Sequence, residues 1–175
     1  TIGPLQIVYG GKAHPRDEAG KALIRQVFEA ARALRNEPIR VVYIPNYDWR
    51  WGQLMTSGVD LWLNTPQRPY EASGTSGMKA ALNGVPSLSV PDGWWLEGHL
   101  EGETGWDIGH SEGISEDPES EVTSLYEKLE SIIMPMFYGQ PQAYAQVMRS
   151  TIAVNASFFN TQRMLSQYLR NAYQS

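Results

Sequence analysis

The sequence predicts an α/β fold in which a doubly wound parallel sheet is followed by a helical appendage at the carboxyl end. Short apolar, β-branched runs alternate with segments whose apolar residues recur at helical spacing. Consecutive strand–helix–strand units of this kind join parallel strands through right-handed crossovers. In the last third of the chain helical patterns dominate, so this part is expected to pack on the sheet domain.

Apolar runs bounded by loop-forming residues predict the buried strands. The second run, Ile39 to Ile44, reads IRVVYI and ends at Pro45-Asn46. A further short strand is expected near residues 106–108. The other expected strands are 5–9, 59–64 and 85–90.

The remaining periodic segments predict helices. Leu23, Val27 and Leu34 recur at the spacing of one helical face between the first two strands. The expected helices are 23–34, 49–56, 75–83, 118–134, 141–156 and 161–173. We therefore expect an α/β domain over residues 1–115 and carboxyl-terminal helices over residues 116–175 that pack on it.

Composition argues against several classes of function. The net charge is −5 and there is no run of basic residues, which disfavours nucleic-acid binding. With no cysteine and three scattered histidines, we expect neither a disulfide nor a metal site. No apolar stretch is long enough to cross a bilayer and no leader pattern is present, so we expect a soluble, cytoplasmic protein without a membrane partner. Because the chain begins at Thr1, close to a strand, we expect it to be a fragment of a longer chain.

The segment that carries the most chemistry follows the third strand and opens a helix. Gly74 and Gly77 allow backbone N–H groups to approach a ligand closely, and Thr75 and Ser76 add hydroxyl donors. The amino terminus of a helix favours an anion. The same residues also fit a glycine-rich turn capped by Ser73 or Thr75. On glycines and hydroxyls alone, a phosphate site and a plain turn are equally good interpretations.

Lys79 favours the phosphate site. A lysine in the first turn of a helix opposes the helix dipole, so it is mildly misplaced as a solvated residue. One turn from a phosphate site, its amine is suitably placed to form an imine with an aldehyde cofactor that carries its own phosphate.

The segment Glu71 to Lys79, EASGTSGMK, with the following AALNG, resembles the pyridoxal-phosphate attachment segment of the glycogen, starch and maltodextrin phosphorylases, especially their shorter bacterial and archaeal branch. The resemblance extends to Gly10-Gly11-Lys12-Ala13, Asn46-Tyr47 and Asp92-Gly93, each after a predicted strand, and is weak over residues 110–175. It implies the Rossmann-like carboxyl-terminal domain of a two-domain glycosyltransferase of glycogen and related carbohydrate metabolism.

The resemblance also implies roles for individual residues. Lys79 would be the catalytic anchor that holds pyridoxal 5'-phosphate as an imine. The residues implied to bind the cofactor are Lys79, Thr75, Ser76, Gly77 and Tyr47. The residues implied to bind the glucosyl unit are Glu71, Ala72, Ser73 and Gly74.

The implied activity is that of a retaining α-1,4-glucan phosphorylase. Such a transferase moves a glucosyl unit from glycogen, starch or maltodextrin to orthophosphate and yields glucose 1-phosphate. In the family, cations that hold the substrate phosphate and an amino-terminal domain complete the site, and neither is part of this sequence. The 175 residues alone are therefore expected to be inactive.

Two other functions remain open at this point. Retaining nucleotide-sugar transferases of the same architecture place two glutamates as E-x7-E here, the second near the nucleotide ribose. In this sequence Lys79 stands eight residues after Glu71, and an ammonium group cannot accept from ribose hydroxyls. A non-catalytic glucan-binding domain is the third hypothesis. Trp94, Trp95 and Trp106 could stack on sugar rings, although packing is the more typical role of tryptophan.

Overall fold

The computed structural model describes residues 3–109 and 118–173, and it confirms the α/β class. The chain forms two compact units, Thr1–Met55 and Thr56–Ser175. Among the described helices, none combines the length and the hydropathy that a membrane crossing requires. The predicted division near residue 115 falls outside the described residues and stays a prediction.

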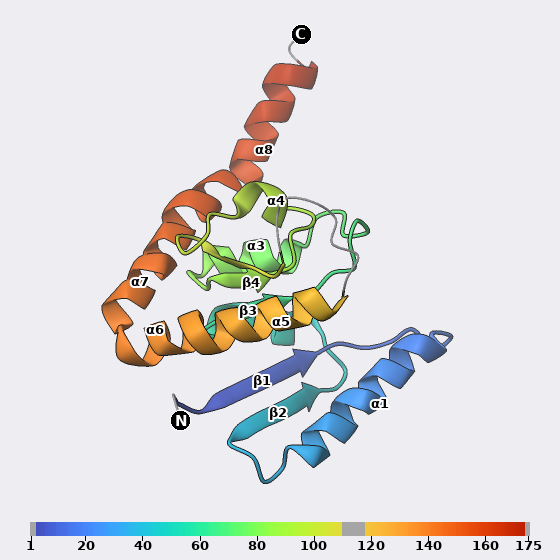
Figure 1. Cartoon of the computed structure of the whole chain (residues 1–175). Coiled ribbons are helices and arrows are strands. Elements are labelled where there is room, and N and C mark those ends of the chain that lie inside the picture. The colour runs from blue at the N-terminus through green and yellow to red at the C-terminus, as the bar shows by residue number, and fades with distance from the viewer. Residues whose placement is uncertain (1–2, 110–117, 174–175) are drawn as a thin grey trace. The chain divides into compact units, whose positions relative to one another are not determined.

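The first unit is a parallel βαβ arrangement (Figure 1). β1 (Leu5–Gly10) pairs in parallel with β2 (Ile39–Ile44) over the whole of both strands. α1 (Glu18–Ala33) connects them, and α2 (Trp49–Gly58) begins after β2.

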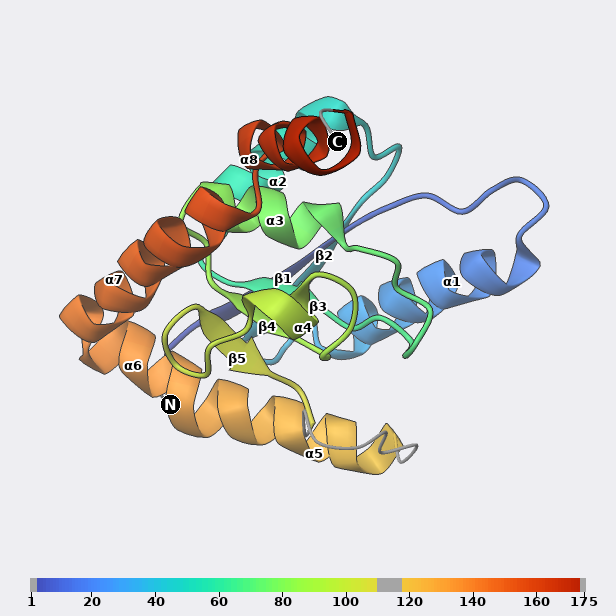
Figure 2. The ribbon, with the colours of Figure 1, turned by 90° about the horizontal axis from the view of Figure 1, so that it is seen from above.

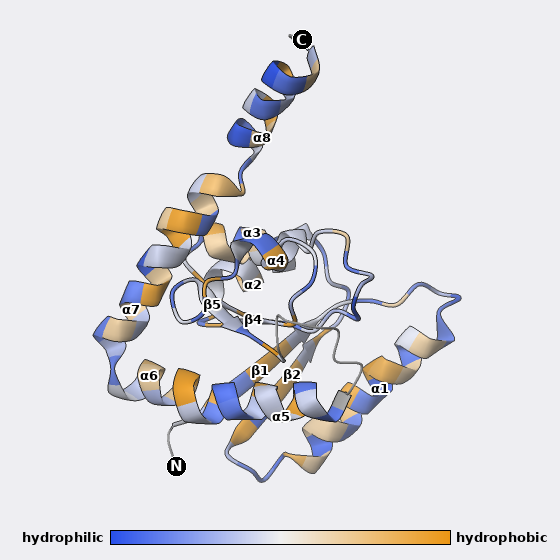
Figure 3. Cartoon of the chain, turned by 45° about the horizontal axis from the view of Figure 1, so that its top comes forward, coloured by the Kyte–Doolittle hydropathy of each residue, from blue (hydrophilic) through white to orange (hydrophobic). Residues whose placement is uncertain are grey.

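The packing of this unit follows from its apolar pattern. Figure 3 shows hydrophobic residues along β1 and β2 and a mixture of hydrophobic and hydrophilic residues along α1. Phe28 of α1 packs on Tyr43 of β2 with their ring centroids 5.2 Å apart. The helix begins where the Asp17 carboxylate accepts from the Gly20 N–H at 2.8 Å, an ordinary amino-terminal cap.

The second unit contains a three-stranded parallel sheet in the order β3-β4-β5. Its strands are β3 (Trp62–Asn64), β4 (Ser87–Ser89) and β5 (Gly105–Asp107). α3 (Thr75–Leu82) connects β3 to β4, and the single turn α4 (Trp95–Gly98) lies between β4 and β5.

Helices make up the rest of this unit, as the sequence predicts. Each of the three helices predicted at the carboxyl end contains a π-helical stretch, labelled η. In chain order the segments are α5 (Pro118–Lys128), η1 (Leu129–Ile133), α6 (Met134–Gly139), α7 (Pro141–Ser150), η2 (Thr151–Ala156), α8 (Thr161–Tyr168) and η3 (Leu169–Tyr173). Figures 1 and 2 show α3 and α5 on opposite sides of the three strands.

The main core of the second unit lies between the sheet and the later helices. Leu88 and Trp106 are partners in adjacent strands and point to the same side of the sheet. They pack with buried residues of η1 and α7, including Ile133 and Tyr144. The Tyr144 hydroxyl donates to the Asp60 carbonyl at 2.6 Å, which ties α7 to the residues before β3.

The third and fourth predicted strands are shorter than expected, with three residues each. The Val85 N–H donates to the Ala80 carbonyl at 3.0 Å and so belongs to the end of α3. Pro86 has no N–H and contributes only its carbonyl, which accepts from the Trp62 N–H at 2.9 Å, and β4 begins at Ser87. The strands form two sheets, one in each unit, and a single continuous doubly wound sheet stays a prediction.

Candidate functional site

The predicted phosphate site lies at the start of α3. Gly74 precedes the helix in the left-handed conformation, with φ 81° and ψ 51°, which glycine adopts at little cost. No side chain caps this helix start. Thr75 and Ser76 are the first two residues of the helix, so their backbone N–H groups lie at the end of the helix where anions are favoured.

Lys79 shares a helical face with these hydroxyls. It follows Thr75 by four residues and Ser76 by three, and such spacings place side chains side by side. Its side chain is exposed, and its ammonium group makes no hydrogen bond or ion pair with the residues that the structure describes. The amine is therefore available to a ligand that also contacts the start of α3.

One argument from the sequence about Lys79 is wrong. The sequence suggests that this lysine opposes the helix dipole in a first turn. Because α3 ends at Leu82, Lys79 lies in its last turn, where the dipole favours a positive charge. The shared face with Thr75 and Ser76, and not an unfavourable charge, is what supports a ligand role.

The two glycines at the start of α3 also have a packing role. A Cβ atom on Gly77 would lie 2.8 Å from Nε1 of Trp94, and one on Gly74 would lie 3.3 Å from its Cδ1. The helix start thus rests on the Trp94 indole, which is buried. The Gly77 N–H donates to the Gly74 carbonyl at 3.1 Å, so this N–H already has a partner within the protein. The role of Gly77 in phosphate binding stays a prediction.

The predicted glucosyl-binding residues form the loop just before α3, and this loop is bonded to the turn after β4. The Glu71 N–H donates to Asp92 Oδ2 at 2.9 Å. The Trp94 N–H donates to the Ser73 carbonyl at 2.8 Å. The sequence shows Asp92-Gly93 only as a dipeptide after a strand, and the structure places it against the loop.

The Glu71 side chain is half-buried and carries no counter-ion among the described residues. Its Oε1 accepts a long hydrogen bond, 3.4 Å, from the Ser73 N–H. The nearby Arg68 is engaged elsewhere, because its guanidinium pairs with Glu121 of α5 at 3.1 Å. Glu71 therefore keeps lone pairs that can accept from a ligand hydroxyl.

Tyr47, the remaining predicted cofactor residue, belongs to the first unit. Its ring covers Gly10, where a Cβ would lie 2.9 Å from Tyr47 Cδ2. Its hydroxyl would lie 2.7 Å from a Cβ on Gly52. The structure thus assembles residues 71–79 in the second unit, while the cofactor role of Tyr47 stays a prediction.

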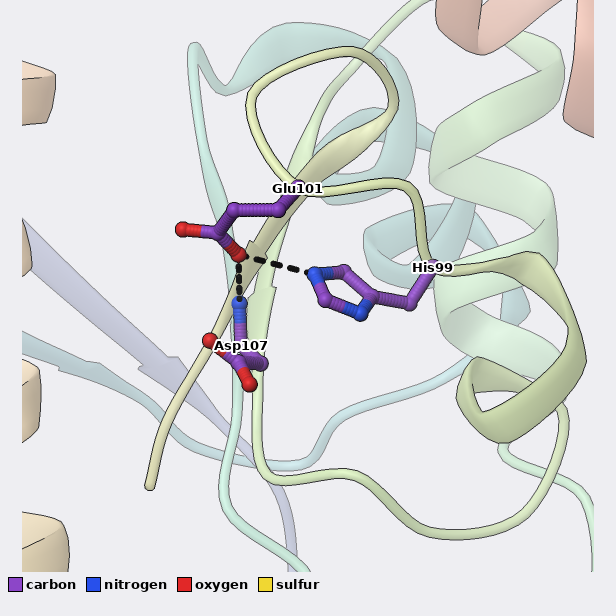
Figure 4. Close-up of side chains that lie close together, drawn as sticks. All are labelled: His99, Glu101 and Asp107. Atoms are coloured by element: carbon purple, nitrogen blue, oxygen red, sulfur yellow. Dashed lines mark hydrogen bonds and ion pairs between the residues drawn. The ribbon is translucent and has the colours of Figure 1, made fainter. Parts of the chain in front are cut away.

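A second polar cluster lies near β5 (Figure 4). His99 Nε2 and Glu101 Oε2 are 2.8 Å apart, and the Asp107 N–H donates to the same oxygen at 3.1 Å. Potential ligand atoms of the three side chains lie within 4.8 Å of one another, although the scattered histidines gave no reason to expect such a group. Lys128 Nζ pairs with Glu101 Oε1 at 2.6 Å and with Asp107 Oδ1, so one ammonium group is shared by both carboxylates. The cluster joins the end of α5 to β5.

The pairing shifts the titration of both partners. Burial raises the pKa of Glu101, but hydrogen bonds with His99, Lys128 and the Asp107 N–H outweigh it and lower the pKa from 4.5 to about 2. Burial lowers the pKa of Lys128, but its bonds with Asp107 and Glu101 outweigh that effect and raise the pKa. Both groups are charged over the ordinary pH range, as an ion pair requires.

Comparison with known proteins identifies the family of the chain. Residues 1–99 match the family model of carbohydrate phosphorylases. Over 97% of its length the chain is 44% identical to a maltodextrin phosphorylase of Thermococcus litoralis. Over the same share it is 39% identical to a glycogen phosphorylase of Mycobacterium tuberculosis and 38% identical to one of Aquifex aeolicus.

The chain spans only part of these relatives, namely 21%, 20% and 25% of their respective lengths. The family model nevertheless covers more than half of the chain, including the whole of residues 71–79. The chain therefore belongs to the carbohydrate phosphorylase family.

Proposed function

We propose that the full-length protein is a retaining α-1,4-glucan phosphorylase that transfers a glucosyl unit to orthophosphate and uses pyridoxal 5'-phosphate. The observation that carries this proposal is the face of α3 that presents Thr75, Ser76 and Lys79 beyond a left-handed Gly74. The relatives named as maltodextrin and glycogen phosphorylases support the choice of substrate class.

The residues present fit the cofactor. An uncapped helix start and two hydroxyl groups suit its phosphate, and a solvent-exposed amine one turn away suits its aldehyde. Thr75, Ser76 and Gly77, with Tyr47, would bind the phosphate, and Lys79 would hold the cofactor covalently. When bound, the cofactor supplies a phosphate group that exchanges a proton with the substrate phosphate.

The loop from Glu71 to Gly74 would bind the transferred glucosyl unit. The Glu71 carboxylate would accept a hydrogen bond from a sugar hydroxyl, since charged acceptors make the stronger hydrogen bonds. Ala72, Ser73 and Gly74 would line the same subsite. By orienting the sugar, these residues fix the anomeric carbon relative to the attacking phosphate, and such positioning lowers the barrier.

Parts of the site that the proposal needs would come from the rest of the full-length chain. These are the cations that hold orthophosphate and the amino-terminal domain that closes the glucan cleft. A cytoplasmic location, where phosphorylated sugars are retained, belongs to the same proposal.

Borohydride trapping tests the proposal directly. Reduction of the full-length protein should leave a pyridoxyl group on Lys79 and on none of Lys12, Lys21 and Lys128. With orthophosphate and maltodextrin, the unreduced protein should release glucose 1-phosphate. A protein without the pyridoxyl mark that transfers glucose from a nucleotide sugar would be a nucleotide-sugar transferase. One that binds maltodextrin but transfers nothing would be a glucan-binding protein.

A further inference from the structure

Asp92 is a buried carboxylate whose bonds all go to backbone N–H groups. Its exposed fraction is 7%. Oδ2 accepts from the Glu71 N–H and Oδ1 from the Gly93 N–H, each at 2.9 Å. Among the described residues it pairs with no cation. A buried carboxylate needs such partners, so these two bonds define the position of both backbone segments relative to the side chain.

A second contact fixes the same two segments. The Trp94 N–H donates to the Ser73 carbonyl at 2.8 Å. Between the two bonds, Gly93 has φ 56°, and a Cβ there would lie 2.5 Å from the Ser73 carbonyl oxygen and 3.1 Å from Glu71 Cγ. The segments are thus bonded at both ends and in contact between them, with no room for a side chain.

The Glu71 side chain depends on this arrangement because nothing else holds it strongly. Its carboxylate has no ion pair with any residue that the structure describes, and its bond to the Ser73 N–H is long. The direction of the side chain is therefore set by the backbone at Glu71, which Asp92 anchors. We propose that Asp92 is a positioning residue that fixes Glu71 for the transferred sugar, an inference that rests on the proposed function.

Two measurements on the full-length protein test this role. In Asp92→Ala, kcat/KM for phosphorolysis should fall by about 10- to 100-fold, mainly through kcat, as expected for a displaced binding group. Amide hydrogen exchange over residues 70–75 should become faster. Asp92→Asn keeps the shape and one acceptor oxygen, so it should recover part of both losses and report on the role if the alanine variant fails to fold.

A double-mutant cycle separates action through Glu71 from a general loss of structure. If Asp92 works through Glu71, Asp92→Asn should cost clearly less in a Glu71→Gln background than in the wild type. Asp107→Asn is the matched control, because Asp107 is also 7% exposed but its carboxylate pairs with Lys128 of α5. It should lower the unfolding temperature while leaving kcat/KM within about twofold.

The outcomes distinguish the two proposals. Unchanged exchange and turnover in both Asp92 variants, or additive losses with Glu71→Gln, would overturn the role of Asp92 while leaving the phosphorylase proposal intact. Faster exchange in the Asp92 variants of a wild type that binds no pyridoxal phosphate and forms no glucose 1-phosphate would overturn the phosphorylase proposal. The role of Asp92 in catalysis would fall with it, and only its bonds to the loop would remain.

Discussion

At the level of single residues, Lys79 and Glu71 share a property that suits them to ligand binding. Each carries a charge that no described residue neutralises. Lys79 is exposed and lies where the helix dipole favours it, so its charge costs little stability. Because neither side chain holds the fold together, changes at both positions should affect function more than stability.

Replacing Lys79 tests the cofactor proposal without disturbing the fold. In the full-length protein, Lys79→Ala should abolish retention of pyridoxal phosphate and phosphorolysis, because the covalent anchor is lost. Its free energy of unfolding in the cofactor-free form should change by no more than about 0.5 kcal/mol, as for other surface substitutions. Lys21→Ala, a change on α1 in the first unit, is the control and should keep the cofactor. A Lys79→Ala protein that phosphorolyses maltodextrin without cofactor would contradict the proposal.

Glu71→Gln tests the glucosyl subsite. A hydrogen bond to a charged group typically contributes about 1.5 to 3 kcal/mol, so kcat/KM should fall by roughly 10- to 150-fold. We expect kcat to fall more than the apparent affinity for glucan, since the bond is made to the sugar being transferred. Steady-state kinetics with maltodextrin and orthophosphate measures both. An unchanged catalytic efficiency would place Glu71 outside the subsite.

At the level of elements, the start of α3 packs against a side chain from the turn after β4. Trp94 lies against Gly74 and Gly77, and its rings also approach Gly98 and Phe159. The helix start is thus placed by packing as well as by its own glycines. This arrangement explains how an uncapped helix end can stay in place before any ligand binds.

Adding a methyl group at Gly77 should disturb this packing. A Cβ there would meet Trp94 Nε1 at 2.8 Å, so Gly77→Ala should destabilise the fold by about 1 to 3 kcal/mol despite the better helix propensity of alanine. Gly139→Ala is the control, because nothing lies within 4 Å of a Cβ at that position. Chemical unfolding of both variants measures the difference. Equal stability of the two would show that the indole moves aside at little cost.

The ion pairs that Lys128 makes with Glu101 and Asp107 should make stability depend on pH. The pKa of Glu101 is lowered from 4.5 to about 2, so its contribution is present above about pH 4.5 and is lost as the pH falls toward 2. The unfolding temperature of Glu101→Gln should therefore lie below that of the wild type at pH 6, and the difference should vanish near pH 2. Glu103→Gln, a nearby exposed carboxylate, is the control. A difference that persists unchanged at pH 2 would assign the effect to packing.

At the level of the whole molecule, local signals in the sequence predict elements well and their contacts poorly. The βαβ run, the start of α3 and the three carboxyl-terminal helical stretches follow from apolar spacing and from glycine and proline. The length of β4 does not, because it depends on where the Val85 N–H is used. The support of Gly77 by Trp94, and that of Glu71 by Asp92, join residues 17 and 21 positions apart that no local pattern connects.

The 175 residues taken by themselves would hold only part of the proposed active site. They should fold, because each unit contains parallel strands joined by a helix and the second has an apolar core built around Leu88 and Trp106. They should not catalyse. Under the proposed function, the cations for orthophosphate and the opposite wall of the cleft would come from parts of the full-length chain outside these residues, which span 20 to 25% of the named relatives. Positioning of the reactants can account for roughly 7 to 11 kcal/mol of barrier lowering, and an open half-site would lose this positioning.

Incubating the isolated chain with pyridoxal phosphate, orthophosphate and maltodextrin should therefore yield no glucose 1-phosphate, whereas the full-length protein in the same assay should produce it. Sustained turnover by the isolated chain would show that these residues already contain a complete active site.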